Sequence, residues 1–323
     1  MNTVPYYAYK VKHVILSWVV AFFSKRVSLT QSGSYELRRG EFPGNIVAVR
    51  FAFDNRLMHL GDQLFHLGTM RALIQSGIDT AIVGPTPLAP LFDRLGIRVT
   101  TSTDVEKLPG VLIITKKELF WQTTRSFPQA SALCLNYKSL GDLRIGDFIH
   151  SEVCRIFKEV KKDPIQPLST DLWKLPTFPL HANTSFASKH TNCIIFNDFV
   201  ASGFLGIAKQ RKHLHNIAQE QKKEHMAHCV YVGSAKEACT SAPLFIDSDL
   251  RGKLSLMELI ERIADSTVVA VISFDTFIAH LACLYGKNAT IVPRRRTWKS
   301  WIKKHFFPMS VFAPETIVEI NSL

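Results

Sequence analysis

From Ile46 onward, short runs of apolar residues alternate with stretches in which apolar residues recur at helical spacing. Short apolar runs are typical of buried strands, and the longer periodic stretches are typical of amphipathic helices. The first half of the chain predicts strands at 46–53, 80–84, 111–115 and 132–135 and helices at 62–75, 88–95 and 148–160. Continuous apolar strands separated by helices indicate a parallel sheet with helices on both faces.

The same alternation returns in the second half of the chain. It predicts strands at 193–197, 229–233, 268–273 and 289–292 and helices at 209–221, 255–264 and 276–285. The predicted fold class is α/β, with two Rossmann-like domains that face each other across a central cleft.

A proline-rich stretch separates the two halves. Residues 161–185 show little periodic pattern and hold four prolines, as expected of a linker. At 323 residues the chain is also longer than a usual single domain. We predict an amino-terminal segment at 1–40, an amino-terminal Rossmann-like domain at 41–163, a linker at 164–185 and a carboxyl-terminal Rossmann-like domain at 186–323.

The amino-terminal segment contains one apolar run, residues 14–23, with basic residues on both sides. The run is shorter than the roughly 20 residues that a membrane-spanning helix needs, and Ser24-Lys25-Arg26 replaces the small-residue cleavage site of a signal peptide. We predict a helix that lies in a membrane interface, with Trp18 and the phenylalanines inserted. A helix packed on the protein itself and a signal anchor are the alternatives.

The net charge of the chain is +12, and residues 209–223 and 294–304 form two dense basic blocks. This balance favours anionic partners such as nucleic acid, lipid headgroups, phosphorylated sugars or nucleotide phosphates, and a solvated basic face is the alternative. The six cysteines are scattered, without a C-x-x-C pair. This pattern indicates a reducing, cytoplasmic environment in which cysteines fill the core.

Candidate chemistry begins at Asp275-Thr276, between the predicted strand 268–273 and the helix that follows it. Backbone N–H groups at the start of a helix are unpaired and the helix dipole is positive there, so a phosphate is stabilised. Thr276 adds a hydroxyl donor, Asp275 can accept bonds from sugar hydroxyls, and His280 lies on the same helix face as Thr276. An ordinary helix cap and a packed histidine are the alternatives.

Several motifs occur in a fixed order around this turn: Asp249-Leu250-Arg251-Gly252, Ser255-Leu256-Met257-Glu258-Leu259, Asp275-Thr276, His280-Leu281-Ala282 and Gly286-Lys287. They resemble the patterns D-L-x-G-x-x-S-L-x-E-L and D-T-G-x-x-H-L-A-x-x-x-G-x-P of the ADP-heptose:lipopolysaccharide heptosyltransferases. Gly61-Asp62 is similar to the G-D that opens the first helix in that family. In the family this aspartate is the proposed general base, so the resemblance gives that role to Asp62, with a helix cap as the alternative.

The resemblance implies the GT-B arrangement, with an acceptor domain before a donor domain, and an inverting sugar transfer that needs no metal and no cofactor. It implies a nucleotide sugar, ADP-heptose first, as donor and the core of lipopolysaccharide or lipooligosaccharide as acceptor. The enzyme would be cytoplasmic and peripherally associated with the inner membrane. The implied donor-binding residues are Lys209, Asp275, Thr276, Phe277 and His280, and Arg211 and Arg294 are candidates for phosphate or acceptor contacts.

The chain departs from the family pattern at the site itself. Phe277 stands where the family has glycine, and Asn288 stands where it has proline. Another nucleotide sugar, a protein acceptor, and a non-catalytic protein that binds nucleotide sugars or membrane surfaces are therefore the alternatives.

Two further patterns carry competing interpretations. Asp247-Ser248-Asp249 fits the D-x-D of metal-dependent glycosyltransferases, but Asp249 already belongs to the D-L-x-G pattern, so no metal is predicted. Residues 294–307 mix cations with aromatic side chains as binders of single-stranded nucleic acid do. No recognised nucleic-acid fold signature accompanies them, so no nucleic-acid partner is expected.

Overall fold

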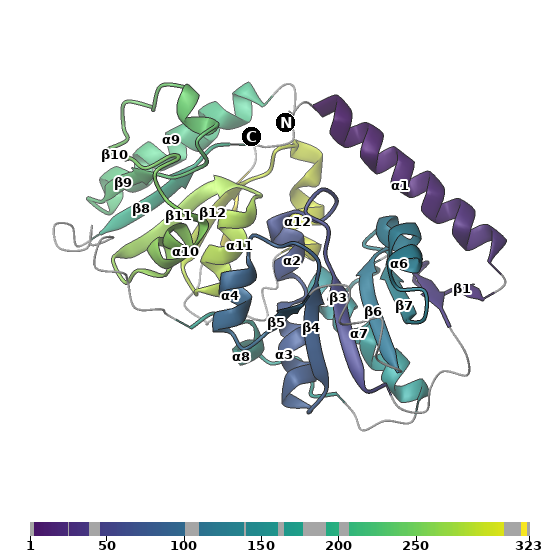
Figure 1. Cartoon of the computed structure of the whole chain (residues 1–323). Coiled ribbons are helices and arrows are strands. Elements are labelled where there is room, and N and C mark those ends of the chain that lie inside the picture. Colours follow the sequence, from purple (N-terminus) through teal and green to yellow (C-terminus); the bar gives the residue numbers. More distant parts are fainter. Residues whose placement is uncertain are drawn as a thin grey trace. The chain divides into compact units, whose positions relative to one another are not determined.

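The computed structural model describes residues 3–24, 26–38, 46–100, 110–138, 140–160, 165–176, 192–199, 207–306 and 318–321 (Figure 1). The chain divides into two compact units, Met1–Leu172 and Trp173–Leu323. Part of the predicted linker, Pro164 and residues 177–185, lies outside the described residues, as do Lys25 and Phe307. The described part of that linker contains the short helix α8 (Thr170–Trp173) and buries Ile165.

Unit 1 is built on a seven-stranded sheet in the order β1-β2-β7-β6-β3-β4-β5. The strands are β1 (Val27–Leu29), β2 (Tyr35–Leu37), β3 (Ala48–Ala52), β4 (Asp79–Val83), β5 (Arg98–Thr100), β6 (Val111–Lys116) and β7 (Ser131–Leu135). Strands β3 to β7 are parallel, whereas β1 and β2 add an antiparallel pair at the β7 edge. The chain runs outward from β3 to β5 and then returns to β6, so the topological switch point lies between β3 and β6.

The helices of unit 1 are α1 (Thr3–Phe23), α2 (Leu60–Leu64), α3 (Leu67–Gln75), α4 (Ala89–Arg94), η1 (Lys117–Leu119), α6 (Phe120–Ser126) and α7 (Ile145–Glu159). One prediction is wrong in detail, because the single helix expected at 62–75 is divided into α2 and α3. His66 lies between the two helices with its side chain buried. Its ring Nε2 atom is hydrogen-bonded to the hydroxyl group of Tyr137, which follows β7. Within the described residues, no helix has both the length and the apolar character needed to cross a membrane.

Unit 2 is built on a six-stranded parallel sheet in the order β10-β9-β8-β11-β12-β13. The strands are β8 (Cys193–Asn197), β9 (His228–Tyr231), β10 (Ser248–Asp249), β11 (Val268–Phe274), β12 (Asn288–Val292) and β13 (Val318–Ile320). The helices are α9 (Ala208–Glu224), η3 (Glu237–Cys239), α10 (Leu256–Ala264), α11 (Phe277–Leu284), η4 (Arg296–Trp298) and α12 (Lys299–His305). The switch point of this sheet lies between β8 and β11.

The predicted α/β class with two parallel-sheet domains is confirmed. Each strand predicted from an apolar run is present, because the central strands are buried on both faces: every residue of β7 and of β8 is buried. The sequence did not predict β1, β2, β5, β10 or β13, which have only two or three residues each. The cleft between the two domains stays a prediction.

Candidate active site

The switch point of unit 1 brings Asp62 and Lys116 together. Lys116 ends β6, and Asp62 lies in the first turn of α2. The Lys116 Nζ atom is 2.5 Å from Asp62 Oδ2, and the backbone N–H of His59 donates to the same oxygen at 3.1 Å. In the part of the chain that the structure describes, no partner is bound to Oδ1. Because the Asp62 side chain is 17% exposed, Oδ1 is the oxygen left to receive a proton from a ligand.

Two opposing effects set the charge of Asp62. Burial by itself raises the pKa of the carboxyl group, but the Lys116 ammonium and its hydrogen bond, together with smaller effects of His59, outweigh burial, so the pKa of Asp62 lies below its usual value. The carboxylate is therefore ionised at neutral pH, which is the state that a general base requires. Asp62 is a residue predicted from the sequence, whereas Lys116 is not. The signal was present, because a charged residue directly follows the apolar run 111–115 at the carboxyl end of a strand.

His66 and Tyr137 form a neutral pair beside this ion pair. His66 is completely buried, and burial lowers its pKa to about 3. Its Nε2 atom is 2.6 Å from the Tyr137 hydroxyl, whose pKa burial raises well above its usual value. The Lys116 ammonium lies 5.3 Å from the centre of the Tyr137 ring, within the range of a cation–π contact. This pair thus packs against Lys116 without adding a charge near Asp62.

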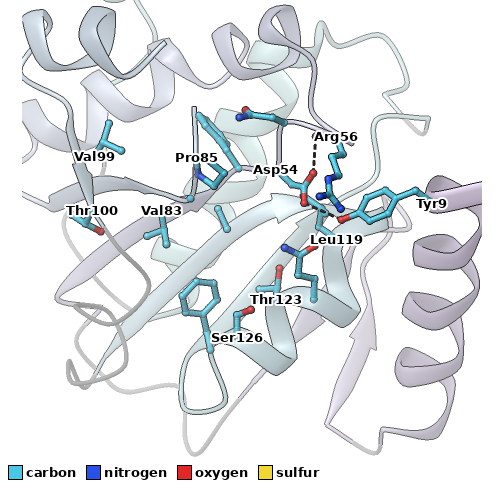
Figure 2. A pocket seen from close by; sticks show the side chains of 16 residues that line it. Tyr9, Asp54, Arg56, Val83, Pro85, Val99, Thr100, Leu119, Thr123 and Ser126 are labelled. Atoms are coloured by element: carbon cyan, nitrogen blue, oxygen red, sulfur yellow. Dashed lines mark hydrogen bonds between the residues drawn. The ribbon is translucent and has the colours of Figure 1, made fainter. Parts of the chain in front are cut away.

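A cavity of about 850 Å³ lies at the carboxyl ends of β3, β4 and β5 (Figure 2). Its volume falls in the range of small-molecule sites, roughly 300 to 1,000 Å³. Its apolar lining comes mainly from Phe53, Val83, Pro85, Val99, Leu119 and Phe127, and α6 and Tyr9 of α1 supply further walls. Gly84 has a φ of +104°, and a Cβ at this position would meet the Phe53 carbonyl oxygen, so only glycine fits there.

Asp54 lies at the rim of this cavity and forms hydrogen bonds with the residues around it. Its Oδ1 atom accepts bonds from the backbone N–H groups of Arg56 at 2.7 Å and Leu57 at 3.2 Å, and its Oδ2 atom accepts the Tyr9 hydroxyl at 3.2 Å (Figure 2). Lys116 Nζ in turn donates to the Leu57 carbonyl at 3.3 Å. One loop, residues 54–59, therefore joins the cavity rim to Asp62. Neither Asp54 nor Arg56 is among the site residues predicted from the sequence.

At the switch point of unit 2, the Asp275 carboxylate is held by Arg294. Asp275 follows β11 and Arg294 follows β12, which is the parallel neighbour of β11. The Arg294 Nε atom lies 3.0 Å from both carboxylate oxygens, Nη2 lies 2.8 Å from Oδ2, and the backbone N–H donates to Oδ1 at 3.1 Å. A carboxylate offers about four acceptor positions, and here Arg294 occupies them. The predicted role of Asp275 as an acceptor for sugar hydroxyls stays a prediction.

Three other predicted donor residues lie at the start of α11 or on it. Thr276 precedes the helix in the cap position, but its hydroxyl makes no cap bond, and its Oγ1 atom is buried without a partner within the described residues. Phe277 is the first residue of the helix and is half-buried. His280 is 7% exposed and packs against the ring of Phe306 at 5.5 Å. The helix start thus presents an unused hydroxyl, whereas His280 is packed.

The predicted phosphate contacts on α9 differ from each other. Lys209, in the first turn of the helix, is exposed. Arg211 instead lies 3.3 Å from the carboxylate of Asp198, which also bonds to His215 at 2.7 Å and to Tyr231. Burial raises the pKa of Asp198, but these hydrogen bonds outweigh it and hold the pKa below its usual value. Asp198 follows β8 at the switch point, and the sequence analysis did not name it.

Several residues of the stretch 249–259, which resembles the heptosyltransferase pattern, make contacts that stabilise the fold of unit 2. Arg251 is 3% exposed and bonds to both oxygens of Asp249 at 2.9 and 2.7 Å. Gly252 has a φ of +70°, and a Cβ there would lie 2.7 Å from the Cα atom of Ala235. Ser255 and Glu258 form a reciprocal capping box at the start of α10.

Both aspartates of the D-x-D pattern likewise bind other groups of the protein. Asp247 bonds to Lys222 at 2.6 Å and to the backbone N–H of Cys229 at 2.8 Å. Among the residues that the structure covers, no three His, Cys, Asp or Glu side chains gather in a way that could hold a metal ion.

Two α/β units, each with polar residues at the switch point of its sheet, are a fold that the chain shares with solved two-domain glycosyltransferases. An ADP-heptose lipopolysaccharide heptosyltransferase II from E. coli is similar to the chain at 12% identity, with a TM-score of 0.53, over 85% of this chain and 90% of the other. A glycosyl transferase family 9 protein from Veillonella parvula is similar at 11% identity, with a TM-score of 0.57, over 86% and 87%. No protein-family model matches the chain, and no curated protein matches it in sequence. At this identity the likeness establishes the fold.

Proposed function

We propose that the chain is an inverting, metal-independent glycosyltransferase that moves a sugar from a nucleotide sugar, ADP-heptose first, onto the core of lipopolysaccharide or lipooligosaccharide. One observation carries the proposal: Asp62 is an ionised carboxylate with one open oxygen, at a switch point and linked by the loop 54–59 to a ligand-sized cavity. Ligands bind at such switch points in open α/β sheets. The similarity of the fold to heptosyltransferase II supports the same class of reaction.

In the proposed reaction, Asp62 Oδ1 accepts the proton of an acceptor hydroxyl. The hydroxyl oxygen forms a bond to the anomeric carbon of the donor, and the bond from that carbon to the diphosphate oxygen breaks. The hydroxyl attacks from the face opposite the diphosphate, which leaves with the electron pair, so the configuration at the anomeric carbon inverts. Lys116 has a supporting role, because it keeps Asp62 ionised before the proton arrives.

In this proposal, residues of unit 2 bind the departing diphosphate. The exposed ammonium of Lys209 supplies charge, and the start of α11 supplies N–H groups together with the unused Thr276 hydroxyl. Phe277 would lie against the donor where glycine would leave space. The presence of Phe277 in place of glycine favours a second candidate function, which is transfer from a different nucleotide sugar or to a protein acceptor.

The proposed enzyme works in the cytoplasm, peripherally on the inner membrane, because a glycolipid acceptor is presented there. The net charge of +12 suits an anionic acceptor and an anionic surface. No nucleic-acid partner is proposed.

Transfer assays with ADP-heptose, with UDP-sugars and with a truncated core acceptor test the proposal. We expect transfer that requires both the donor and the acceptor. The nucleotide sugar that is used should also raise the thermal midpoint, since a ligand that binds only the folded state stabilises it. Binding without transfer would indicate the non-catalytic alternative, and donor hydrolysis that is independent of any acceptor would rule out a transferase.

A further inference from the structure

Helix α1 packs on unit 1 through Val20 and Ala21, which contact the apolar core of that unit, and through polar side chains. Ser17 Oγ donates to the Glu118 carbonyl at 2.9 Å and accepts the backbone N–H of Trp121 at 3.1 Å. His13 is 4% exposed, with its ring between Tyr9 at 4.3 Å and Trp121 at 5.6 Å. Burial lowers the pKa of His13, so this contact is made by a neutral ring. The helix is therefore attached to unit 1 through hydrogen bonds and ring contacts at fixed positions, beside η1 and α6 (Figure 1).

The opposite face of α1 is apolar and exposed. Six of the thirteen exposed large hydrophobic side chains in the described part of the chain lie on this one helix: Val11 (54%), Val14 (43%), Ile15 (54%), Trp18 (58%), Phe22 (70%) and Phe23 (76%). The rings of Trp18 and Phe22 stack at 5.6 Å. A concentration of this kind marks an interaction site, whereas single exposed apolar residues do not.

The charges on α1 indicate what covers this face. At 3.6 residues per turn, the exposed side chains of Lys10 and Lys12 fall on either side of the stripe that contains Trp18. The helix has no acidic residue, and the exposed Arg26 follows it. An apolar stripe with an aromatic ring and flanking cations matches the boundary between acyl chains and anionic headgroups. A second copy docked through the same face would instead bring like charges together.

We propose that α1 docks unit 1 on the surface of an anionic bilayer, with Trp18 and Phe22 in the acyl boundary and Lys10 and Lys12 at the headgroups. Tyr9 belongs to the same helix and closes the cavity rim through its bond to Asp54 (Figure 2). Docking therefore holds the cavity next to the lipid surface, where a glycolipid acceptor is presented. That last step rests on the proposed function, and the docking itself does not.

Vesicle flotation of the full chain tests the docking. We expect the chain to float with phosphatidylcholine vesicles that contain phosphatidylglycerol and to float less with phosphatidylcholine alone. The variant Trp18→Ser/Phe22→Ser should bind at least about tenfold more weakly, because two apolar side chains no longer enter the lipid. Lys10→Gln/Lys12→Gln should lose only the preference for phosphatidylglycerol. The matched control Leu244→Ser/Trp301→Ser removes two exposed apolar side chains from unit 2 and should float like the wild type.

A second measurement distinguishes the loss of membrane binding from misfolding of a variant. Trp18 fluorescence should be quenched by brominated acyl chains, and the conservative variant Trp18→Phe should float normally and lose that quenching. Equal flotation of Trp18→Ser/Phe22→Ser and the wild type would overturn the proposal. So would self-association through α1 without flotation, which would mean that a second copy covers the face. A failure of sugar transfer would leave the flotation result unchanged, so the two proposals fail separately.

Discussion

In unit 1 the Asp62 carboxylate meets the Lys116 ammonium through one oxygen, whereas in unit 2 the Asp275 carboxylate meets the Arg294 guanidinium through both. Both aspartates lie at the switch point of a parallel sheet. An ammonium group is a compact point charge, but a guanidinium is a planar fork that matches both oxygens of a carboxylate. The carboxyl ends of the central strands therefore carry an open acceptor in one unit and a closed clamp in the other.

The difference indicates how the two units divide the chemistry. Unit 1 offers an ionised oxygen and a cavity, which suit an acceptor that must lose a proton. At its switch point, unit 2 offers a helix start and the unused Thr276 hydroxyl. These are hydrogen-bond donors and suit a diphosphate. The following predictions test this division.

The largest effect is expected from Asp62→Asn. The amide keeps the shape of the side chain but cannot take the proton, so turnover should fall about 10²- to 10⁴-fold. Donor binding, measured as the shift in thermal midpoint, should persist. Asp93→Asn is the matched control, because Asp93 is an exposed aspartate on α4, and its turnover should be normal. Turnover of Asp62→Asn at the wild-type rate would exclude Asp62 as the base.

In unit 2, Asp275→Asn should mainly cost stability. It removes the carboxylate that binds the Arg294 guanidinium, whose side chain is 18% exposed, so the free energy of unfolding in urea should fall by about 3 kcal/mol. The double variant Asp275→Asn/Arg294→Met should recover part of this loss. Unchanged stability with lost donor binding would instead make Asp275 a donor ligand, and the comparison of the two units would then reverse.

His66 should make stability depend on pH. Its pKa is about 3 in the folded state, against an ordinary 6.5, so below pH 6.5 the unfolded chain binds a proton that the folded chain excludes. Stability is complete above pH 6.5 and should fall as the pH drops toward 3, by about 2 kcal/mol between pH 8 and pH 5. His66→Gln should remove this part of the dependence in urea unfolding. His225→Gln, at the end of α9, should leave it in place.

The smallest effect is a displacement of the pH profile by Lys116→Met. Without the ammonium, burial remains and raises the pKa of Asp62. The acid limb of kcat/KM should therefore move to higher pH by about one unit or more. Lys117→Met is the control, because the neighbouring Lys117 donates to the Gly33 carbonyl and not to Asp62. An unmoved acid limb in Lys116→Met would mean that Lys116 does not set the ionisation of Asp62.

The alternation of apolar runs and periodic stretches predicts two α/β units, with Asp62 at the start of a helix and Asp275 directly after a strand. Central parallel strands are buried on both faces, so they are apolar throughout and stand out between periodic helices. A polar residue directly after such a strand, such as Asp275, is then at the edge where ligands bind. The edge strands were missed, because two or three residues carry no readable alternation.

Tertiary structure alone decided which charges meet. Asp62 and Lys116 are 54 positions apart and Asp275 and Arg294 are 19 apart, and parallel pairing of neighbouring strands brings each pair to one sheet edge. Packing also decided which face of α1 points outward. The apolar run 14–23 is visible in the sequence, but its aromatic face is exposed because the other face of the helix contacts unit 1, through the hydrogen bonds of Ser17 and the packing of Val20 and Ala21.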